Sequence, residues 1–354
     1  MNAQFTKHEL IFKQASGTSR GVLTTKETYL LEISKNGQKG IGECAIFRGL
    51  SYDDVPDYEE KLTWLCKNIN LDFEVLKKEL LHYPSIIFGL EQALLNLEHG
   101  EDLYFPSDFT DGKDSIKING LIWMGNADFM QSQIEEKLAK GFDCIKLKIG
   151  VDWKSEKEII KKLREKFPKE QLELRVDANG AFSYEEARMV LQELADLGIH
   201  SIEQPIKKSE VRSPKSEENS EKKSTDCCVP WNEMAKLCAE TPTPIALDEE
   251  LIGVIDFEEK KKLLETIKPQ YIILKPALVG GFSGSDEWIV LAESLGIDWW
   301  ITSALESNIG LNAICQYTYT KKNPLPQGLG TGALFTNNFE THLQLEGDQM
   351  WHKK

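Results

Sequence analysis

The pattern of apolar and polar positions changes near residue 115. Before that point, residues 29–33 (YLLEI) and 40–46 (GIGECAI) are typical of strands, and the Asn36-Gly37 pair between them is typical of a two-residue type I′ hairpin turn. Two helical segments follow, with apolar residues at i, i+3 and i+4 spacing, namely Leu62, Leu65 and Cys66 and then Leu90, Ala93, Leu94 and Leu97. We therefore predict an α+β domain over residues 1–115.

After residue 115, short apolar strands alternate regularly with amphipathic helices, one of which begins with a Ser183/Glu186 capping box. Seven such units, with a candidate eighth strand over residues 327–329, favour a parallel barrel. An open, doubly wound sheet is the alternative, although no GxGxxG sequence follows the first strand. The candidate strands are residues 116–121, 144–148, 172–177, 200–203, 244–248, 271–275 and 297–302.

We predict that residues 116–325 form the barrel and that residues 326–354 supply its last strand and a segment that returns to the N-terminal domain. Residues 207–226 interrupt the alternation, with six basic residues, five acidic residues and Val211 as the only aliphatic one. Such a composition cannot bury a core, so we expect a solvated, mobile insertion in the loop after the fourth strand. A basic regulatory patch is the weaker interpretation, because the charges nearly cancel.

The composition bounds the partners of the protein. The 354 residues include 42 Lys and Arg and 57 Asp and Glu, for a formal net charge of −15 at pH 7, which disfavours nucleic acid as a partner. No apolar run approaches the roughly 20 residues of a membrane span, and the first residues contain no apolar signal core, so we expect no membrane association. Seven scattered cysteines without a CxxC pair predict reduced thiols and a cytoplasmic location. The sequence does not indicate an oligomeric state.

Ionisable residues fall at the carboxyl ends of five consecutive candidate strands, namely Lys148, Asp177, Glu203, Asp248 and Lys275. Their spacing is about one strand–helix unit once the insertion is discounted. In a parallel barrel these ends meet at one mouth, where catalytic groups lie. Each carboxylate alone could be a helix N-cap, but a structural role for all five together is the weaker interpretation.

Three carboxylates in one mouth would repel one another and raise one another's pKa. A hard divalent cation removes this cost, and an all-oxygen donor set suits Mg²⁺ or Mn²⁺. The lysines flank the carboxylates in strand order, and a lysine beside a metal ion can act as a base. The pattern thus predicts proton abstraction next to a metal-bound substrate carboxylate. A non-catalytic barrel that binds an anion is the alternative from another class.

Five motifs resemble the enolase superfamily in its muconate-lactonizing branch, namely IKLKIG (145–150), VDANGAF (176–182), IEQP (202–205), ALDEE (246–250) and LKPALVGG (274–281). The resemblance covers nearly the whole chain. It implies an α/β fold, a modified (β/α)7β TIM-type barrel with an N-terminal α+β capping domain. It also implies that Asp177, Glu203 and Asp248 bind Mg²⁺, or Mn²⁺, and that Lys148 and Lys275 are the acid/base pair.

Within this branch the chain looks most like the o-succinylbenzoate synthases, dehydratases of menaquinone biosynthesis, through GIGECA (40–45), GLEQALLNL (89–97), INGLIWMG (118–125) and TSALESNIGL (302–311). This resemblance implies a small dicarboxylate substrate. We expect Asp248 to bind the ion and Glu249 to support Asp248 without binding the ion itself. The candidate substrate-binding residues are Lys146, Asn179, Ser303, Glu306, Ser307 and Arg48, the last in a loop over residues 45–51 that we expect to close the mouth.

Two relatives of the same branch stay open as alternatives, the N-succinylamino acid racemases and the dipeptide epimerases, because they share the catalytic residues. Dipeptide epimerases usually present an aspartate pair near the eighth strand to the amine of the dipeptide. The corresponding segment here, QGLGTGALFTNN (327–338), has no carboxylate, which disfavours a substrate with an ammonium group.

Overall fold

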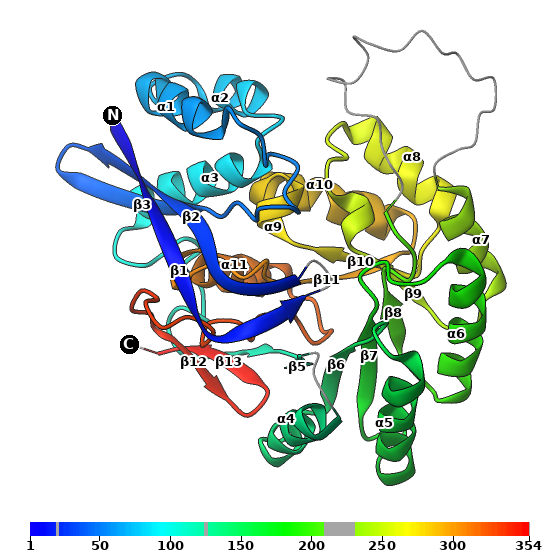
Figure 1. Ribbon diagram of the computed structural model, residues 1–354. Coiled ribbons are helices and arrows are strands. Elements are labelled where there is room, and N and C mark those ends of the chain that lie inside the picture. Colours follow the sequence, from blue (N-terminus) through cyan, green and yellow to red (C-terminus); the bar gives the residue numbers. More distant parts are fainter. Residues whose placement is uncertain (19–20, 124–126, 209–230, 354) are drawn as a thin grey trace, which may run out of the picture.

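The N-terminal part of the chain folds into an antiparallel sheet packed against helices (Figure 1). A computed structural model describes residues 1–18, 21–123, 127–208 and 231–353. The sheet has the order β1-β2-β3. Its strands are β1 (Asn2–Thr18), β2 (Gly21–Lys35) and β3 (Gln38–Cys44), and the helices are α1 (Tyr58–Asn68), α2 (Phe73–Glu79) and α3 (Pro84–His99).

The predicted hairpin turn is confirmed, because Asn36 and Gly37 both have positive φ angles, 52° and 82°, between the paired residues Lys35 and Gln38. The sequence interpretation missed β1. In residues 2–9 of that strand no side chain is fully buried, so the apolar periodicity that marks a strand is weak there.

Helix α3 packs closely against β3 because two glycines of the GIGEC sequence leave room for it. A Cβ atom on Gly40 would lie 2.1 Å from the carbonyl oxygen of Ala93, and one on Gly42 would lie 2.0 Å from that of Gly89. On its other side α3 contacts the barrel, where the carboxylate of Glu91 accepts the backbone N–H of Ser283 at the start of α10 (3.2 Å). The helix is therefore shared by the cap and the barrel.

The second part of the chain is a curved sheet of seven parallel strands in the order β11-β10-β9-β8-β7-β6-β5 with helices on its outside (Figure 1). The strands are β5 (Gly120–Ile122), β6 (Cys144–Lys148), β7 (Glu173–Asp177), β8 (Ser201–Glu203), β9 (Ile245–Leu247), β10 (Tyr271–Leu274) and β11 (Asp298–Ile301). The helices are α4 (Ala127–Ala139), α5 (Trp153–Lys166), α6 (Tyr184–Asp196), α7 (Asn232–Glu240), the 3₁₀ helix η2 (Glu249–Leu251), α8 (Phe257–Ile267), α9 (Pro276–Val279), α10 (Gly281–Ser294) and α11 (Asn308–Lys321).

Residues 327 and 328 close this sheet into a barrel. Gln327 forms a parallel bridge with Ile118, two residues before β5, and Gly328 forms one with Thr302, directly after β11. The eighth strand predicted over residues 327–329 is therefore reduced to two bridged residues. The architecture predicted from the sequence, a modified (β/α)7β barrel with an N-terminal α+β cap, is confirmed, whereas the exact residue limits of the domains stay predictions.

One strand differs from the prediction. Residues 116–121 form two short strands, β4 (Ile116–Lys117) and β5, because Ile116 and Lys117 pair with the C-terminal hairpin and not with the barrel. The hairpin consists of β12 (Leu343–Glu346) and β13 (Gln349–His352), and β13 pairs with β4.

The apolar side chains form one large core in the barrel and a separate core between the cap sheet and its helices. None of the helices in the described ranges has the length and apolarity that crossing a bilayer requires. Of the predicted insertion over residues 207–226, only Lys207 and Lys208 belong to the described residues.

Candidate active site

The five ionisable residues at the predicted strand ends lie together at one end of the barrel. Lys148, the last residue of β6, is the register neighbour of Asp177 on β7, which is in turn the neighbour of Glu203 on β8. Asp248 directly follows β9 and Lys275 directly follows β10. Because parallel strands of a barrel end at the same rim, their side chains converge on one mouth.

Strand β6 turns both of its lysines toward the inside of the barrel, since alternate side chains of a strand share one face. Nζ of Lys146 lies 2.7 Å from Oε2 of Glu203 and 3.7 Å from Oδ2 of Asp177. Nζ of Lys148 lies 3.0 Å from the same Asp177 oxygen and 2.6 Å from Oδ1 of Asn179. The two lysines thus hold the carboxylate of Asp177 between them.

Lys275 lies on the opposite side of the carboxylates. It donates a hydrogen bond to Oδ2 of Asp248, and its Nζ lies 3.9 Å from Oε1 of Glu203. Burial favours the neutral amine, but the negative charges of Asp248 and Glu203 outweigh burial and hold the pKa of Lys275 above its usual value. The site therefore contains a fixed positive charge on this side.

The three carboxylates differ in how well their charge is compensated. Burial works to raise the pKa of Asp177, but the nearby lysines outweigh it and lower that pKa to about 2. Burial and the charges of Asp177 and Asp248 raise the pKa of Glu203 to about 7. Burial, with the charge of Glu249, also raises the pKa of Asp248. The lysines therefore compensate Glu203 and Asp248 less well than Asp177, and a further cation could stabilise the charged forms of these two carboxylates.

Two amide side chains hold the turns that carry these groups. Oε1 of Gln204 accepts the backbone N–H groups of Asp248 (3.3 Å) and Glu250 (3.2 Å), and Nδ2 of Asn179 donates to Oε1 of Glu249 (3.1 Å). Gln204 and Asn179 themselves have positive φ angles of 41° and 44°. Sequence reasoning singled out Asn179 but missed Gln204, although Gln204 stands in the quoted IEQP motif.

A cavity of about 110 Å³ opens above the lysines and carboxylates. Its lining includes Asn119, Trp123 and Thr331, which sequence reasoning did not single out, although Asn119 and Trp123 stand in the quoted INGLIWMG motif. Oδ1 of Asn119 is buried and has no hydrogen-bond partner among the described residues, so it can accept a hydrogen bond from a ligand. The predicted site residues that line this cavity are Lys146, Lys148, Asp177, Asn179, Glu203, Glu249, Lys275 and Ser303.

The loop predicted to close the mouth contributes two apolar side chains, Phe47 and Leu50, to the lining. Arg48, which we predicted to bind substrate from this loop, is not among the lining residues. Its guanidinium forms ion pairs within the cap, with Glu27 and with Asp54 (2.8 Å to the latter). The structure therefore does not bring Arg48 together with the other site residues.

The loop after β11 is only partly at the cavity. Ser303 lines it, together with Ala304 and Leu305. Glu306 and Ser307, also predicted to bind substrate, are fully buried behind the loop and are not among the lining residues. Ser307 is the N-cap of α11, and its side chain accepts the backbone N–H of Ile309.

Comparison with known proteins assigns the family. A family model described as enolase C-terminal domain-like matches residues 130–216. The o-succinylbenzoate synthase of Desulfotalea psychrophila is 42% identical to this chain over 380 aligned residues, which cover 98% of each protein. This chain belongs to the o-succinylbenzoate synthase family. Its members are lyases of the enolase superfamily, which uses a divalent metal ion.

A solved structure of the same fold supports this placement. The crystal structure of MenC from Desulfotalea psychrophila LSv54 superimposes with a TM-score of 0.84, has 40% sequence identity and covers 99% of both chains. A second activity occurs among similar proteins, since the N-succinylamino acid racemase of Thermus thermophilus is 33% identical over 85% of this chain and 78% of its own. The family resemblance deduced from the sequence motifs is therefore confirmed.

Proposed function

We propose that this protein is an o-succinylbenzoate synthase that dehydrates 2-succinyl-6-hydroxy-2,4-cyclohexadiene-1-carboxylate to o-succinylbenzoate in menaquinone biosynthesis. The observation that carries the proposal is 42% sequence identity, over 98% of both chains, with a synthase of that name, combined with two lysines on either side of three buried carboxylates. A barrel that only binds an anion has no need of three carboxylates in its mouth.

The residues at the mouth fit a divalent cation. Oε1 of Glu203 is buried and accepts no hydrogen bond from the described residues, and the pKa of Glu203 is raised to about 7 by burial and by neighbouring carboxylates. Both features indicate negative charge in need of a cation. We propose that Asp177, Glu203 and Asp248 hold Mg²⁺ or Mn²⁺, because all the donors are oxygens. When bound, the ion would draw electron density from the substrate carboxylate and so make the adjacent C–H more acidic.

Lys148 is the proposed base. Its Nζ lies at the cavity between Asp177 and Asn179, which orient it. As a neutral amine it removes the proton from C1, next to the carboxylate. As an ammonium it returns that proton to the hydroxyl that leaves C6, so that one water departs and the ring becomes aromatic. A single group serves both transfers if the hydrogen and the hydroxyl leave from the same face.

Lys275 is proposed to stabilise charge from the other side of the ring, as an ammonium that stays protonated. Its contacts with Asp248 and Glu203 support that role, because neighbouring carboxylates favour the charged form of a lysine. Lys146, 2.7 Å from Glu203, is proposed to fix that carboxylate and to support the carboxylate of the substrate. Asn119, Ser303 and Thr331 offer polar groups to the rest of the dicarboxylate.

The decisive experiment is to follow dehydration of the cyclohexadiene substrate by the purified protein. We expect turnover with Mg²⁺, none after removal of the ion with EDTA, and recovery when Mg²⁺ is added back. Asp177→Asn should lose turnover, whereas Asp196→Asn, the same change at an exposed residue of α6, should not. Turnover that survives EDTA, or binding of the substrate without any conversion in Mg²⁺, would contradict the proposal.

Racemisation of N-succinylamino acids is the second candidate. It is favoured by the 33% identity with the Thermus thermophilus racemase and by the two lysines on opposite sides of the cavity, since a racemase needs a base on each face. A panel of N-succinylamino acids tests it. Exchange of the α-hydrogen without detectable dehydration of the cyclohexadiene substrate would make the racemase the better assignment.

We also propose a cytoplasmic location. The cysteines in the described part of the chain, Cys44, Cys66, Cys144, Cys238 and Cys315, are all free, which supports a reducing compartment. Fractionation of the cells that make the protein tests this proposal, and recovery outside the cytoplasm would contradict it.

A further inference from the structure

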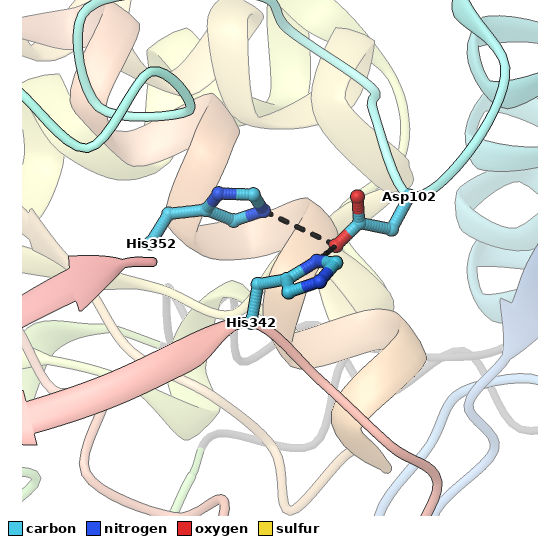
Figure 2. A group of neighbouring side chains, drawn as sticks. All are labelled: Asp102, His342 and His352. Carbon is cyan, nitrogen blue, oxygen red and sulfur yellow. Dashed lines mark hydrogen bonds and ion pairs between the residues drawn. The ribbon is translucent and has the colours of Figure 1, made fainter. Parts of the chain in front are cut away.

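The loop after α3 and the C-terminal hairpin meet at one carboxylate and two imidazoles, away from the active-site cavity. Figure 2 shows the rings of His342 and His352 turned toward the same oxygen of Asp102. Oδ2 of Asp102 lies 2.6 Å from Nδ1 of His342 and 3.2 Å from Nε2 of His352. The three candidate ligand atoms all lie within 4.8 Å of one another. The proposed catalytic chemistry gives these residues no role.

Hydrogen bonding within this cluster is incomplete. Oδ1 of Asp102 is buried and accepts no hydrogen bond from the described residues, although a buried carboxylate oxygen normally has a donor. Nδ1 of His352 also has no hydrogen-bond partner among the described residues. It would lack one both with a proton and with a metal ion on Nε2, so Nδ1 does not tell the metal-free site from the metal-bound site.

We propose that Asp102, His342 and His352 form a second metal site that binds Zn²⁺. Two imidazole nitrogens and one carboxylate oxygen are the donors that Zn²⁺ accepts, whereas Mg²⁺ prefers oxygen alone. With metal–ligand distances of about 2.0–2.2 Å, tetrahedral donors stand roughly 3.3 Å apart. The two separations from the Asp102 oxygen are 2.6 and 3.2 Å and the two histidine nitrogens lie within 4.8 Å of each other, so rotation of the side chains can bring the three donors to one ion. The side chain of His342 is 44% exposed, which gives the ion a path from solvent and leaves room for water as the fourth ligand.

The ion would act as a clamp between parts of the chain that are distant in sequence. The backbone carbonyl of Asp102 accepts hydrogen bonds from Asn312 (2.9 Å) and Gln316 (2.8 Å) of helix α11. Within the described residues, the hairpin that ends in His352 and is preceded by His342 pairs with no strand other than the two-residue β4. A Zn²⁺ ion at Asp102 would therefore fasten this weakly paired hairpin to the cap loop and to the barrel.

The test is titration of the full-length protein with Zn²⁺ in excess Mg²⁺, so that the proposed barrel-mouth site is already filled. Isothermal titration calorimetry should find one equivalent of Zn²⁺ bound. His342→Gln should weaken binding by about ten-fold or more, because it removes a ligand while changing a half-exposed side chain. His99→Gln, at an exposed histidine at the end of α3, is the matched control and should bind as the wild type does.

A second variant separates the two proposed metal sites. Asp177→Asn should keep the Zn²⁺ equivalent that His342→Gln loses, and Zn²⁺ should raise the melting temperature of the wild type but not that of His342→Gln. Replacement of Zn²⁺ by Co²⁺ should give the strong visible absorption of four-coordinate cobalt in the wild type and in Asp177→Asn, but not in His342→Gln. If the wild type binds no Zn²⁺ under these conditions, or if His342→Gln binds it as tightly, the cluster is a hydrogen-bonded junction and the proposal is wrong.

Discussion

Glu43→Gln tests how the cap holds the loop that lines the cavity. The carboxylate of Glu43 is fully buried at the end of β3 and accepts four hydrogen bonds. Oε1 accepts from the hydroxyl of Thr28 (2.8 Å) and the backbone N–H of Ser307 (3.0 Å). Oε2 accepts from the hydroxyl of Ser307 (2.6 Å) and the backbone N–H of Gly310 (2.9 Å). Glu43 thereby fixes the N-terminus of α11.

Glutamine cannot satisfy these donors in either orientation. If the NH₂ group of the glutamine takes the place of Oε2, it faces the N–H of Gly310. If the NH₂ group takes the place of Oε1, it faces the N–H of Ser307. The hydroxyls of Thr28 and Ser307 can rotate to accept a hydrogen bond from it. One backbone N–H and one amide hydrogen are then left unpaired, at about 1–3 kcal/mol each, and the favourable negative charge at the start of α11 is lost. We expect a loss of about 3 kcal/mol in the free energy of unfolding.

Urea unfolding measures this loss, with Glu32→Gln as the control. Glu32 lies on the neighbouring strand β2 and makes two surface contacts, an ion pair with Lys39 (3.2 Å) and a hydrogen bond accepted from Gln4 (3.1 Å), so its substitution should cost at most about 1 kcal/mol. Because residues 303–305 line the cavity and lead into α11, kcat/KM for dehydration should also fall several-fold in Glu43→Gln. Equal unfolding free energies for the two variants would refute the reasoning.

Three further experiments test the proposed roles. Lys148→Ala should abolish dehydration, whereas Lys275→Arg, which keeps a cation, should retain part of it. If proton abstraction were lost only in Lys275→Ala, then Lys275 would be the base and Lys148 the cation that stabilises charge. Asp248→Asn should abolish Mg²⁺ binding in calorimetry and Glu249→Gln should only weaken it, and the reverse order would show that Glu249 is the ligand. Arg48→Ala should change KM less than two-fold, because its guanidinium already pairs with carboxylates of the cap; a large rise in KM would show that it turns to the substrate.

The barrel and its ionisable rim could be predicted because both follow local rules. Strand and helix periods mark the repeating units, and a residue at the end of a parallel strand must lie at the rim whatever the details of packing. Lys148, Asp177, Glu203, Asp248 and Lys275 could therefore be placed without a structure. The position of such a residue in the sequence determines its position in space.

The substrate-binding residues were harder to predict, because their positions depend on contacts between distant segments. Arg48 looked suitable as a free cation in a closing loop, but ion pairs with other cap residues hold it away from the cavity. Ser307 looked like a substrate ligand, but it is used to cap α11 and bind Glu43. Asn119 lines the cavity through the bridging of residues 327 and 328 beside it, which no local pattern reveals.

Helix α3 has a consequence for how this enzyme could be recombined with its relatives. One side of the helix packs closely against Gly40 and Gly42 of the cap. The other side carries Glu91, whose carboxylate accepts a backbone N–H at the start of α10. A chimaera junction placed on either side of α3 would therefore separate the helix from its native partners in the cap or from its native partners in the barrel. A chimaera that exchanges caps must therefore transplant α3 together with the matching residues of α10. Changes of specificity are more simply made within residues 45–51, where Phe47 and Leu50 reach the cavity and α3 stays unchanged.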